Sequence, residues 1–314
     1  MPRHNDFNFD LYRLTIRDAE SLLPFMGELI RTDDQIVDVL RSACGAELDF
    51  RQETSGAIYV WGLRDFTELP SEDYPNTKAI AVTLAKATIE KEGVIFTPDT
   101  VQLGTSVAQP PPASVVTLVF QMTRHLVAVE FKSTVTSGQG WLHALHDILR
   151  RAASQRNFTS TIELQTKPKK SEILKTFVSF QRLTRIKVQL LLPNPELSRL
   201  TQGLYDELQN GGIREYIADM RNPSGLSQRE QTLPHAAAAM AEDGYKKGEV
   251  LMEGIREGRK ETVKTGTRPA RGKVEGIKDF VRGQATTART QEGRIITDAI
   301  LKEIDRVSDD PETA

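Results

Sequence analysis

The sequence predicts an α+β fold with two packed domains and a C-terminal tail. Three observations indicate this class: alternating apolar and polar runs up to about residue 108, a β-β-α-β-α-β order after a proline-rich connector, and a glycine-rich basic segment beyond residue 244. A chain of 314 residues also exceeds what a single hydrophobic core usually serves.

Residues 1–108 are predicted to form a β-rich N-terminal domain. An amphipathic helix is expected around 34–42, where apolar residues recur at helical spacing and Gly45 follows. A hairpin is expected around the turn 53–56, because Gly56 can take the positive φ of a tight turn. Strands are expected at 11–16, 47–52, 57–62, 79–89 and 94–96.

The segment 109–112, Gln-Pro-Pro-Pro, is a stiff extended connector, and we place a domain boundary there. Residues 113–244 then form a second domain. Its first part has the order β-β-α-β-α-β, which favours a ferredoxin-like split β-α-β unit with an extra strand. Strands are expected at 115–121, 126–131, 159–165 and 185–192, and helices at 141–153 and after Ser171.

A helical layer and a basic arm are expected to complete the chain. The layer comprises a helix starting at Asn194-Pro195 and further helices at 213–220 and 234–242. Residues 245–314 form the third region, in which glycines recur too often for a stable helix. We expect hairpins or a flexible arm there, followed by a closing helix at 295–307.

Composition excludes several classes of protein. The shares of 39% hydrophobic and 27% charged residues are ordinary for a folded globular chain. No run of about 18 apolar residues occurs, and the N-terminus has no apolar segment behind its basic residues, so we expect a cytoplasmic protein without membrane contact. The single cysteine, Cys44, can form no internal disulfide and no cysteine-rich zinc site.

Basic residues concentrate in the C-terminal third. The chain has a net charge of −2, but residues 246–294 contain thirteen basic and seven acidic residues, a net +6. Lysine and arginine contacts to phosphates release counterions and give sequence-independent affinity for nucleic acid. The candidate phosphate contacts are Lys246, Lys247, Arg256, Arg259, Lys260, Lys264, Arg268, Arg271 and Lys273.

Further basic residues lie on or beside the predicted split unit. They are Lys167, Lys169, Lys170, Arg182, Arg185 and Lys187. The aromatic residues nearest to them, Phe177 and Phe180, fall at core positions, so base stacking is not indicated. Binding to the backbone of a duplex fits this pattern better.

Three stretches carry a resemblance to a known family. They are 118–131 around Arg124-His125-Leu126, the strand end at 188–195, and 241–266 with its Gly248-x-Val250 pattern. Together they resemble an uncharacterised bacterial family with a domain of unknown function, whose members look like phage-defence or mobile-element proteins. The segment 193–225 also resembles, more faintly, the phage exclusion protein RexA, a DNA binder. The resemblance implies a fold and a biological setting and no site residue.

A Mg²⁺-dependent nuclease is the alternative function. Asp99, Glu130 and Lys132 have the form of a site in which two acids hold Mg²⁺ and a lysine orients the attacking water. Glu130 and Lys132 are expected on one face of a strand, because side chains two residues apart point the same way. Against this reading, the expected domain boundary separates Asp99 from the other two residues.

Other candidate chemistry favours structural roles. His143 and His146 are three residues apart on a predicted helix, a spacing that also occurs by chance on a polar helix face, and no third metal ligand is indicated. Cys44 is expected to be a buried thiol. Gly138-Gln139-Gly140 precedes a helix, but no P-loop lysine follows it. We therefore expect no metal and no cofactor.

These observations favour a non-catalytic DNA-binding component of a bacterial phage-defence system. It would contact the duplex backbone, independently of sequence, through the basic C-terminal arm. A protein-interaction subunit without nucleic acid is the third class considered. The expected partners are duplex DNA, a protein of the same defence system, and a second copy of the chain in a homodimer.

Overall fold

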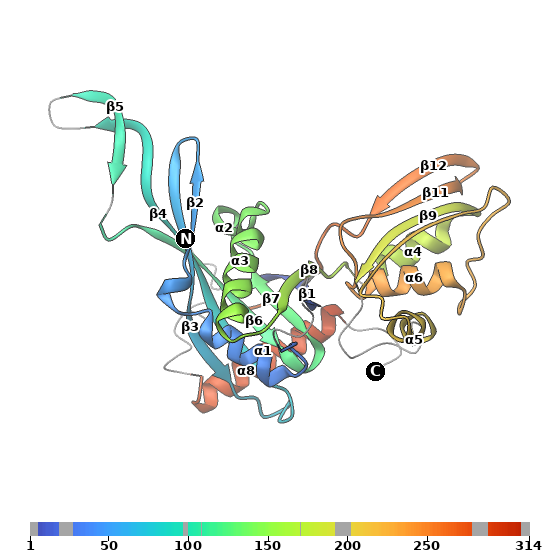
Figure 1. Ribbon diagram of the computed structural model, residues 1–314, viewed down its shortest axis with the longest axis horizontal. Coiled ribbons are helices and arrows are strands. Elements are labelled where there is room, and N and C mark those ends of the chain that lie inside the picture. The colour runs from blue at the N-terminus through green and yellow to red at the C-terminus, as the bar shows by residue number, and fades with distance from the viewer. Residues whose placement is uncertain are drawn as a thin grey trace.

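The computed structural model describes residues 6–18, 28–96, 100–107, 109–169, 171–191, 202–277 and 288–308. It shows the predicted α+β class, with a β-rich N-terminal region and seven α-helices in these ranges. The strands form two antiparallel sheets, a large one of nine strands and a small one of four (Figure 1).

The large sheet contains strands from almost the whole length of the chain. In spatial order they are β13 (Arg271–Val274), β1 (Phe7–Asp18), β7 (Leu126–Glu130), β6 (Ala113–Gln121), β4 (Ala79–Phe96), β3 (Ala57–Leu69) and β2 (Phe50–Thr54). In addition, β5 (Val101–Val107) pairs with β4, and β8 (Ser160–Thr166) pairs with β1.

Both faces of the large sheet are covered by helices. Successive side chains of a strand point alternately into one of two apolar cores, one on each face. On β1, Phe9 and Leu11 face one core, and Tyr12 and Leu14 face the other. The core around Tyr12 is closed by the first three helices, and the core around Phe9 by the last. These helices are α1 (Asp33–Ser42), α2 (Ser133–Thr136), α3 (Gly140–Gln155) and α8 (Gln291–Ser308).

Local sequence explains the limits of the first helix. Thr32 accepts a hydrogen bond from the backbone N–H of Gln35, whose side chain in turn accepts from the N–H of Thr32, a complete capping box. Acidic residues in the first turn and Arg41 in the last complement the helix dipole. Two short 3₁₀ turns, η1 (Ala46–Leu48) and η2 (Met122–Arg124), occur elsewhere in this part of the chain.

The described helices that pack on the small sheet lie on one of its faces. Its strands, in order, are β10 (Glu215–Arg221), β9 (Arg182–Leu191), β11 (Val250–Arg256) and β12 (Arg259–Thr265). Helices α4 (Glu172–Ser179), α5 (Gln202–Asn210) and α6 (Leu233–Glu242) lie against it and close a separate core. Five of the buried positions of α6 are alanines, four of which belong to this core, so the helix can approach the sheet closely.

The sheets group the strands differently from the expected domains. β4 and β6, on either side of 109–112, pair with each other from Ala79–Gln121 to Ala87–Ala113, so the large sheet is continuous across the proline connector. β8 pairs with β1, whereas β9 belongs to the small sheet. The strands expected in one ferredoxin-like unit are thus divided between two sheets, because alternation indicates a strand without indicating its neighbour.

Two further segments differ from expectation. The prediction of a helix at 213–220 is wrong, since Glu215–Arg221 is strand β10, whose alternating exposure matches a sheet with one open face. The expected basic arm is built into both sheets: β11 and β12 form a hairpin in the small sheet, while β13 and α8 belong to the large one. The closing helix was predicted correctly, and residues 278–287 lie outside the described ranges.

One glycine of this region is required by close packing. Gly272 on β13 pairs with Phe9 on β1, and a Cβ at this position would collide with the aromatic ring of Phe9. Only glycine therefore lets β13 add to the edge of the large sheet. Within the described ranges, no helix has the length and apolar character needed to cross a membrane.

Trp141 provides a test of the large core. It is 1% exposed on α3, and its ring packs edge-on against Tyr12 at a centroid distance of 5.3 Å. We expect Trp141→Ala to lower the free energy of unfolding by about 3–5 kcal/mol, because it removes a large buried side chain and leaves a cavity. Ile295→Ala, at a position 59% exposed on α8, should change it by no more than about 0.5 kcal/mol. Urea denaturation measures both, and equal losses would contradict the packing described.

Candidate nucleic-acid interface

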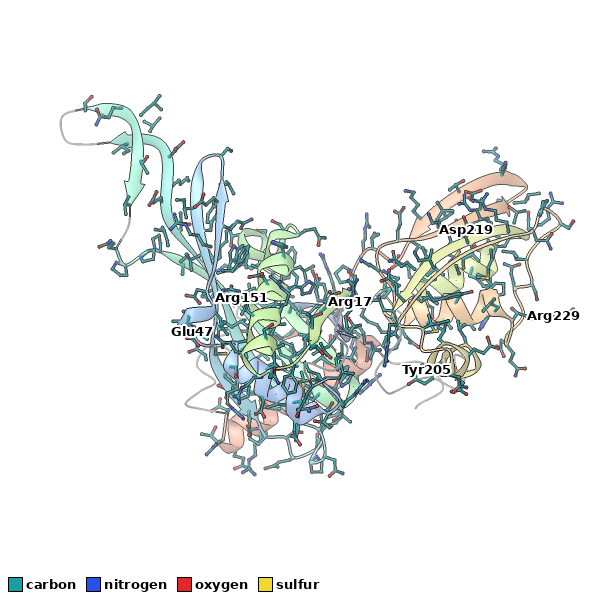
Figure 2. The ribbon with its side chains drawn as sticks, in the orientation of Figure 1. Arg17, Glu47, Arg151, Tyr205, Asp219 and Arg229 are labelled. Atoms are coloured by element: carbon teal, nitrogen blue, oxygen red, sulfur yellow. The ribbon has the colours of Figure 1, made fainter. Side chains whose placement is uncertain are left out.

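The small sheet presents one face that none of the described helices covers. Buried residues of β9, such as Ile186 and Val188, point to the helical side. Arg185 and Lys187, which alternate with them along the strand, lie on the open side. Figure 2 shows Asp219 on the strand layer and Tyr205 on the opposite, helical side. Side chains that alternate with the core residues therefore form an open polar surface.

The acidic side chains on this face are already paired with cations. Arg185 binds both carboxylate oxygens of Asp219, at 2.8 and 2.9 Å, and also binds Glu253 at 2.7 Å. Arg221 binds Asp219 from the other side at 2.7 Å. These hydrogen bonds, that from Arg185 first, hold the pKa of Asp219 well below its usual range. At one end of the face, Lys264 pairs with Glu249 at 2.6 Å.

Several cations of the small sheet and its connections make no such pair. Most of them lie around the open face, whereas Arg259 lies on the side of β12 that carries Val263. They share two features: each belongs to the small sheet or to a segment connected to one of its strands or helices, and none forms an ion pair with a described residue. They are Lys169, Arg182, Lys187, Lys247, Arg259, Lys260 and Arg268. We call these seven residues the free cations. Because Asp219, Glu253 and Glu249 are neutralised by other residues, the free cations give the surface an excess of positive charge.

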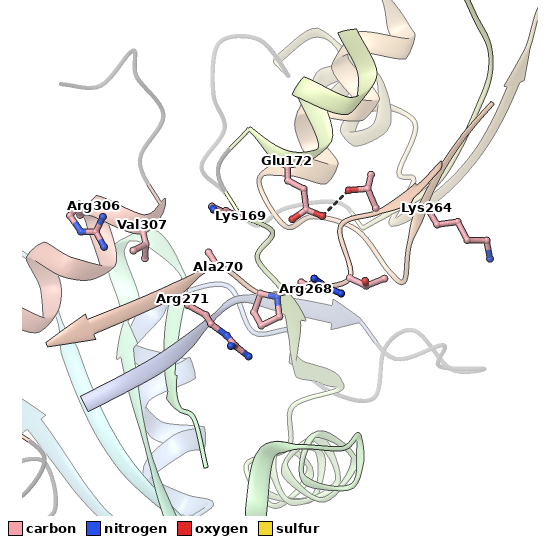
Figure 3. Close-up of a pocket in the computed structure, with 11 residues that line it drawn as sticks. Lys169, Glu172, Lys264, Arg268, Ala270, Arg271, Arg306 and Val307 are labelled. Atoms are coloured by element: carbon pink, nitrogen blue, oxygen red, sulfur yellow. Dashed lines mark hydrogen bonds between the residues drawn. The ribbon is translucent and has the colours of Figure 1, made fainter. Parts of the chain in front are cut away.

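A cleft of about 1000 Å³ continues this surface where the two sheets meet. Figure 3 shows Lys169, Arg268, Arg271 and Arg306 around it. The one acid in its lining, Glu172, accepts hydrogen bonds from the Thr265 hydroxyl at 2.7 Å and the Gly266 N–H at 3.0 Å. Its negative charge is therefore partly compensated within the protein, and the lining is predominantly basic.

Buried polar contacts fix the two sheets to each other behind the cleft. Arg13 on β1 donates to the carbonyl oxygens of Asp243 at 2.9 Å and Arg124 at 2.5 Å. Lys167 donates to the carbonyl oxygen of Glu242 at 3.0 Å, and its ammonium lies 3.4 Å from the Asp243 carboxylate. Desolvation lowers the pKa of Lys167 in this position, an effect that Asp243 opposes.

The nine candidate phosphate contacts fall into three groups. Lys247, Arg259, Lys260 and Arg268 are exposed and belong to the free cations. Four others are paired with acids: Arg256 with Glu261, Lys264 with Glu249, Arg271 with Asp10, and Lys273 with Asp6 and Glu275.

Lys246 differs from all of these. Only 2% of its surface is exposed, and its ammonium donates to the carbonyl oxygen of Gly248 at 2.7 Å. Desolvation lowers its pKa to about 8, although Glu172 acts in the opposite direction. The structure therefore does not place Lys246 on the open surface, because its aliphatic chain is buried where the segment after α6 crosses β9.

Of the three proposed nuclease residues, Glu130 and Lys132 contact the backbone of β6. Asp99 lies outside the described residues. Glu130, 2% exposed at the end of β7, accepts a hydrogen bond from the Thr117 N–H at 3.1 Å. Lys132 lies beyond the strand at the start of α2 and reaches the Val115 carbonyl oxygen at 3.4 Å. β7 itself ends at Glu130, but the backbone of Lys132 is still extended, and the side chains of both residues reach backbone atoms of β6.

The other candidate side chains have structural partners. His146 accepts a hydrogen bond from the Leu164 N–H at 2.8 Å through Nε2, and the ring of His143 packs against Phe50. Burial raises the pKa of the Cys44 thiol to about 11. The described part of the chain contains no group of three or more His, Cys, Asp and Glu side chains that could hold a metal ion.

Sequence reasoning named all seven free cations but missed two residues beside them. Arg221 follows the segment wrongly expected to be a helix, and Arg306 belongs to the closing helix. No local pattern marks either residue. Their relation to the surface arises from strand pairing and from the packing of α8 beside β13.

Comparison with protein families gives one match. Residues 108–284, more than half of the chain, match the model of a domain of unknown function (DUF4747). The chain belongs to the DUF4747 family. All the free cations lie within the DUF4747 region, which contains the whole small sheet and the strands β6, β7, β8 and β13 of the large one. No curated protein matches the chain. The phage-defence setting and the likeness to RexA stay predictions.

Lys246 should make stability depend on pH. Its folded pKa of about 8 lies below its ordinary value of 10.5, so the unfolded chain binds more protons between these values and stability rises with pH there. Relative to Lys246→Met, we expect the native protein to gain about 2 kcal/mol of unfolding free energy between about pH 7.5 and 9.5. Denaturant titrations across this range measure the difference, and parallel profiles for the two proteins would contradict the buried position of Lys246.

Glu130 should contribute to stability. Glu130→Ala leaves the buried Thr117 N–H without this acceptor, so we expect a loss of about 1–3 kcal/mol. Lys132→Ala, at a half-exposed side chain, should cost less than about 1 kcal/mol. Thermal unfolding measures both, together with incubation of plasmid DNA with Mg²⁺. An unchanged melt of Glu130→Ala combined with lost Mg²⁺-dependent cleavage would instead support the nuclease.

Proposed function

We propose that this protein is a non-catalytic DNA-binding component that contacts the duplex backbone through the free cations. The observation that carries the proposal is the set of free cations, which pair with no described acid: six lie around the open face and the cleft, and Arg259 lies at the end of β12. Phosphate contacts of this kind supply sequence-independent affinity that falls steeply with salt.

The pairing of the acids supports an anionic ligand. Asp219 and Glu253 would repel phosphates if they were free, but Arg185 and Arg221 neutralise them on the surface. Asp219 and Glu253 both bind the guanidinium of Arg185, so the positions of these three side chains are fixed before any ligand binds. A polyanion approaching the sheet would meet the charges of the free cations at the periphery.

The dimensions of the surface suit several successive phosphates. Strand β12 has seven residues, which at about 3.3 Å per residue span about 20 Å. With a rise of about 3.4 Å per base pair, this length corresponds to roughly six base pairs. Lys260 lies near one end of β12, and Arg268 lies three residues beyond its other end.

The chemistry of the face favours the backbone over the bases. Among the described strands of the small sheet, aromatic side chains such as Tyr216 pack toward the helical core. Single-stranded nucleic acid is usually held by bases stacked on aromatic rings. Contacts by lysine and arginine alone favour a duplex bound through its phosphates.

The biological setting is a separate part of the proposal. The resemblance noted in the sequence indicates a phage-defence system, with a protein of the same system as a second partner. The identity of neighbouring genes tests this setting directly. DNA binding, in contrast, can be measured on the isolated protein and does not depend on it.

The salt dependence of DNA affinity tests the free cations. We expect the triple variant Lys187→Ala, Lys260→Ala and Arg268→Ala to lower the slope of log affinity against log salt by roughly 0.9 for each phosphate that is no longer bound, and by up to about 2.7 if all three residues bind phosphates. Two labelled duplexes of unrelated sequence, followed by fluorescence anisotropy, should be affected equally, because backbone contacts carry no sequence information.

A matched control removes the same charge elsewhere. Arg31, Lys175 and Lys302 are exposed and lie away from the open face, Lys175 on helix α4 of the opposite side. The corresponding triple alanine variant should keep the slope of the native protein. Equal slopes for the native protein and both variants, with unchanged melts, would overturn the proposal and favour an interaction subunit without nucleic acid.

A further inference from the structure

Strands β4 and β5 extend as a two-stranded ribbon beyond the rest of the large sheet (Figure 1). Pairing of β4 with β6 ends at Ala87 and pairing with β3 at Lys91, while β4 itself continues to Phe96. Among the described strands, β5 pairs with this last part of β4 alone. Every residue of β5 except Gly104 is exposed.

One face of the ribbon is apolar and open to solvent. Val94 and Leu103 are directly opposite each other and are 68% and 84% exposed. Val101 and Val107 share this face at 61% and 58% exposed, since they lie two and four residues from Leu103 on the same strand. A two-stranded ribbon of this kind is at best marginally stable in water without further packing.

The free edge of β5 has no protection against pairing. Proteins usually guard exposed strand edges with charged residues, prolines or a covering element. The other terminal strands of the described sheets, β2, β8, β10, β12 and β13, each contain at least one charged residue. β5, with the sequence VQLGTSV, contains no charge and no proline.

We propose that β5 is a dimerisation edge, which pairs antiparallel with β5 of a second copy of this chain about a two-fold axis at Gly104. The two ribbons then form one four-stranded sheet. In this register Leu103 faces Thr105 of the partner subunit, and Val101 faces Val107 of the partner subunit. The apolar side chains of both ribbons gather on one face of the joined sheet. The inference does not depend on DNA binding.

The sequence of β5 identifies the occupant as a second copy. Pairing about Gly104 is self-complementary, because it opposes an apolar residue to an apolar one at both ends of the strand, Val101 to Val107, and leaves no charge without a partner. A nucleic acid would require cations on this edge, and β5 has none. A strand edge without charged side chains also lacks the groups that would give electrostatic specificity for a different protein.

Mass measurement tests the dimer and its edge. We expect the native chain to reach twice its 35.1 kDa mass in sedimentation velocity as its concentration rises. Leu103→Lys should weaken the dimer about 100-fold, about tenfold for each of the two ammonium groups placed in the joined sheet. Val178→Lys, a similarly exposed apolar position on helix α4, should leave dimerisation unchanged. A monomer at all concentrations, or a dimer that persists in Leu103→Lys, would overturn the proposal.

Cross-linking tests the register independently of the strength of the dimer. Two copies of residue 104 at the axis would have Cα atoms about 4.5–5.5 Å apart, within reach of a disulfide. In a Cys44→Ser background, Gly104→Cys should therefore form a cross-linked dimer under mild oxidation. Gly93→Cys is the matched control, since Gly93 pairs with Gly104 inside the ribbon and lies one strand further from the axis. Equal cross-linking of the two variants would contradict pairing about Gly104.

Discussion

Arg13 and Lys167 extend to the carbonyl end of helix α6 and hold the large sheet against the small one. Both side chains are buried, and each donates to backbone carbonyl oxygens near Glu242 and Asp243. Cations at the C-terminal end of a helix are favourable, because the helix dipole and the unpaired carbonyl groups attract them. Gly244, with a φ of +88°, ends the helix close to both side chains.

This junction determines where the basic residues lie. The two chain segments that cross between the sheets run side by side at Pro168 and Pro269, and each brings a free cation, Lys169 or Arg268, to the cleft. The small sheet and its connections supply the remaining free cations. A surface that combines both sheets therefore depends on the buried contacts behind it, although none of the buried groups would touch a ligand.

The ribbon of β4 and β5 lies outside the matched DUF4747 region and has the opposite chemistry. It presents apolar side chains and an uncharged strand edge, whereas the small sheet presents paired acids and unpaired cations. The two surfaces therefore suit different partners: a second copy of the chain at the ribbon, and a polyanion at the small sheet.

The sequence by itself determined the α+β class and most helices and strands, because these follow from the periodicity of apolar side chains and from local capping. The concentration of basic residues is a direct property of the sequence. Tertiary structure decided which strands are neighbours. Alternation does not reveal that β6 pairs with β4, or that Glu215–Arg221 extends the small sheet as a strand. Tertiary structure also decided which cations are free. An ion pair such as that of Arg271 with Asp10 joins residues far apart in the chain, and only packing brings their charges together.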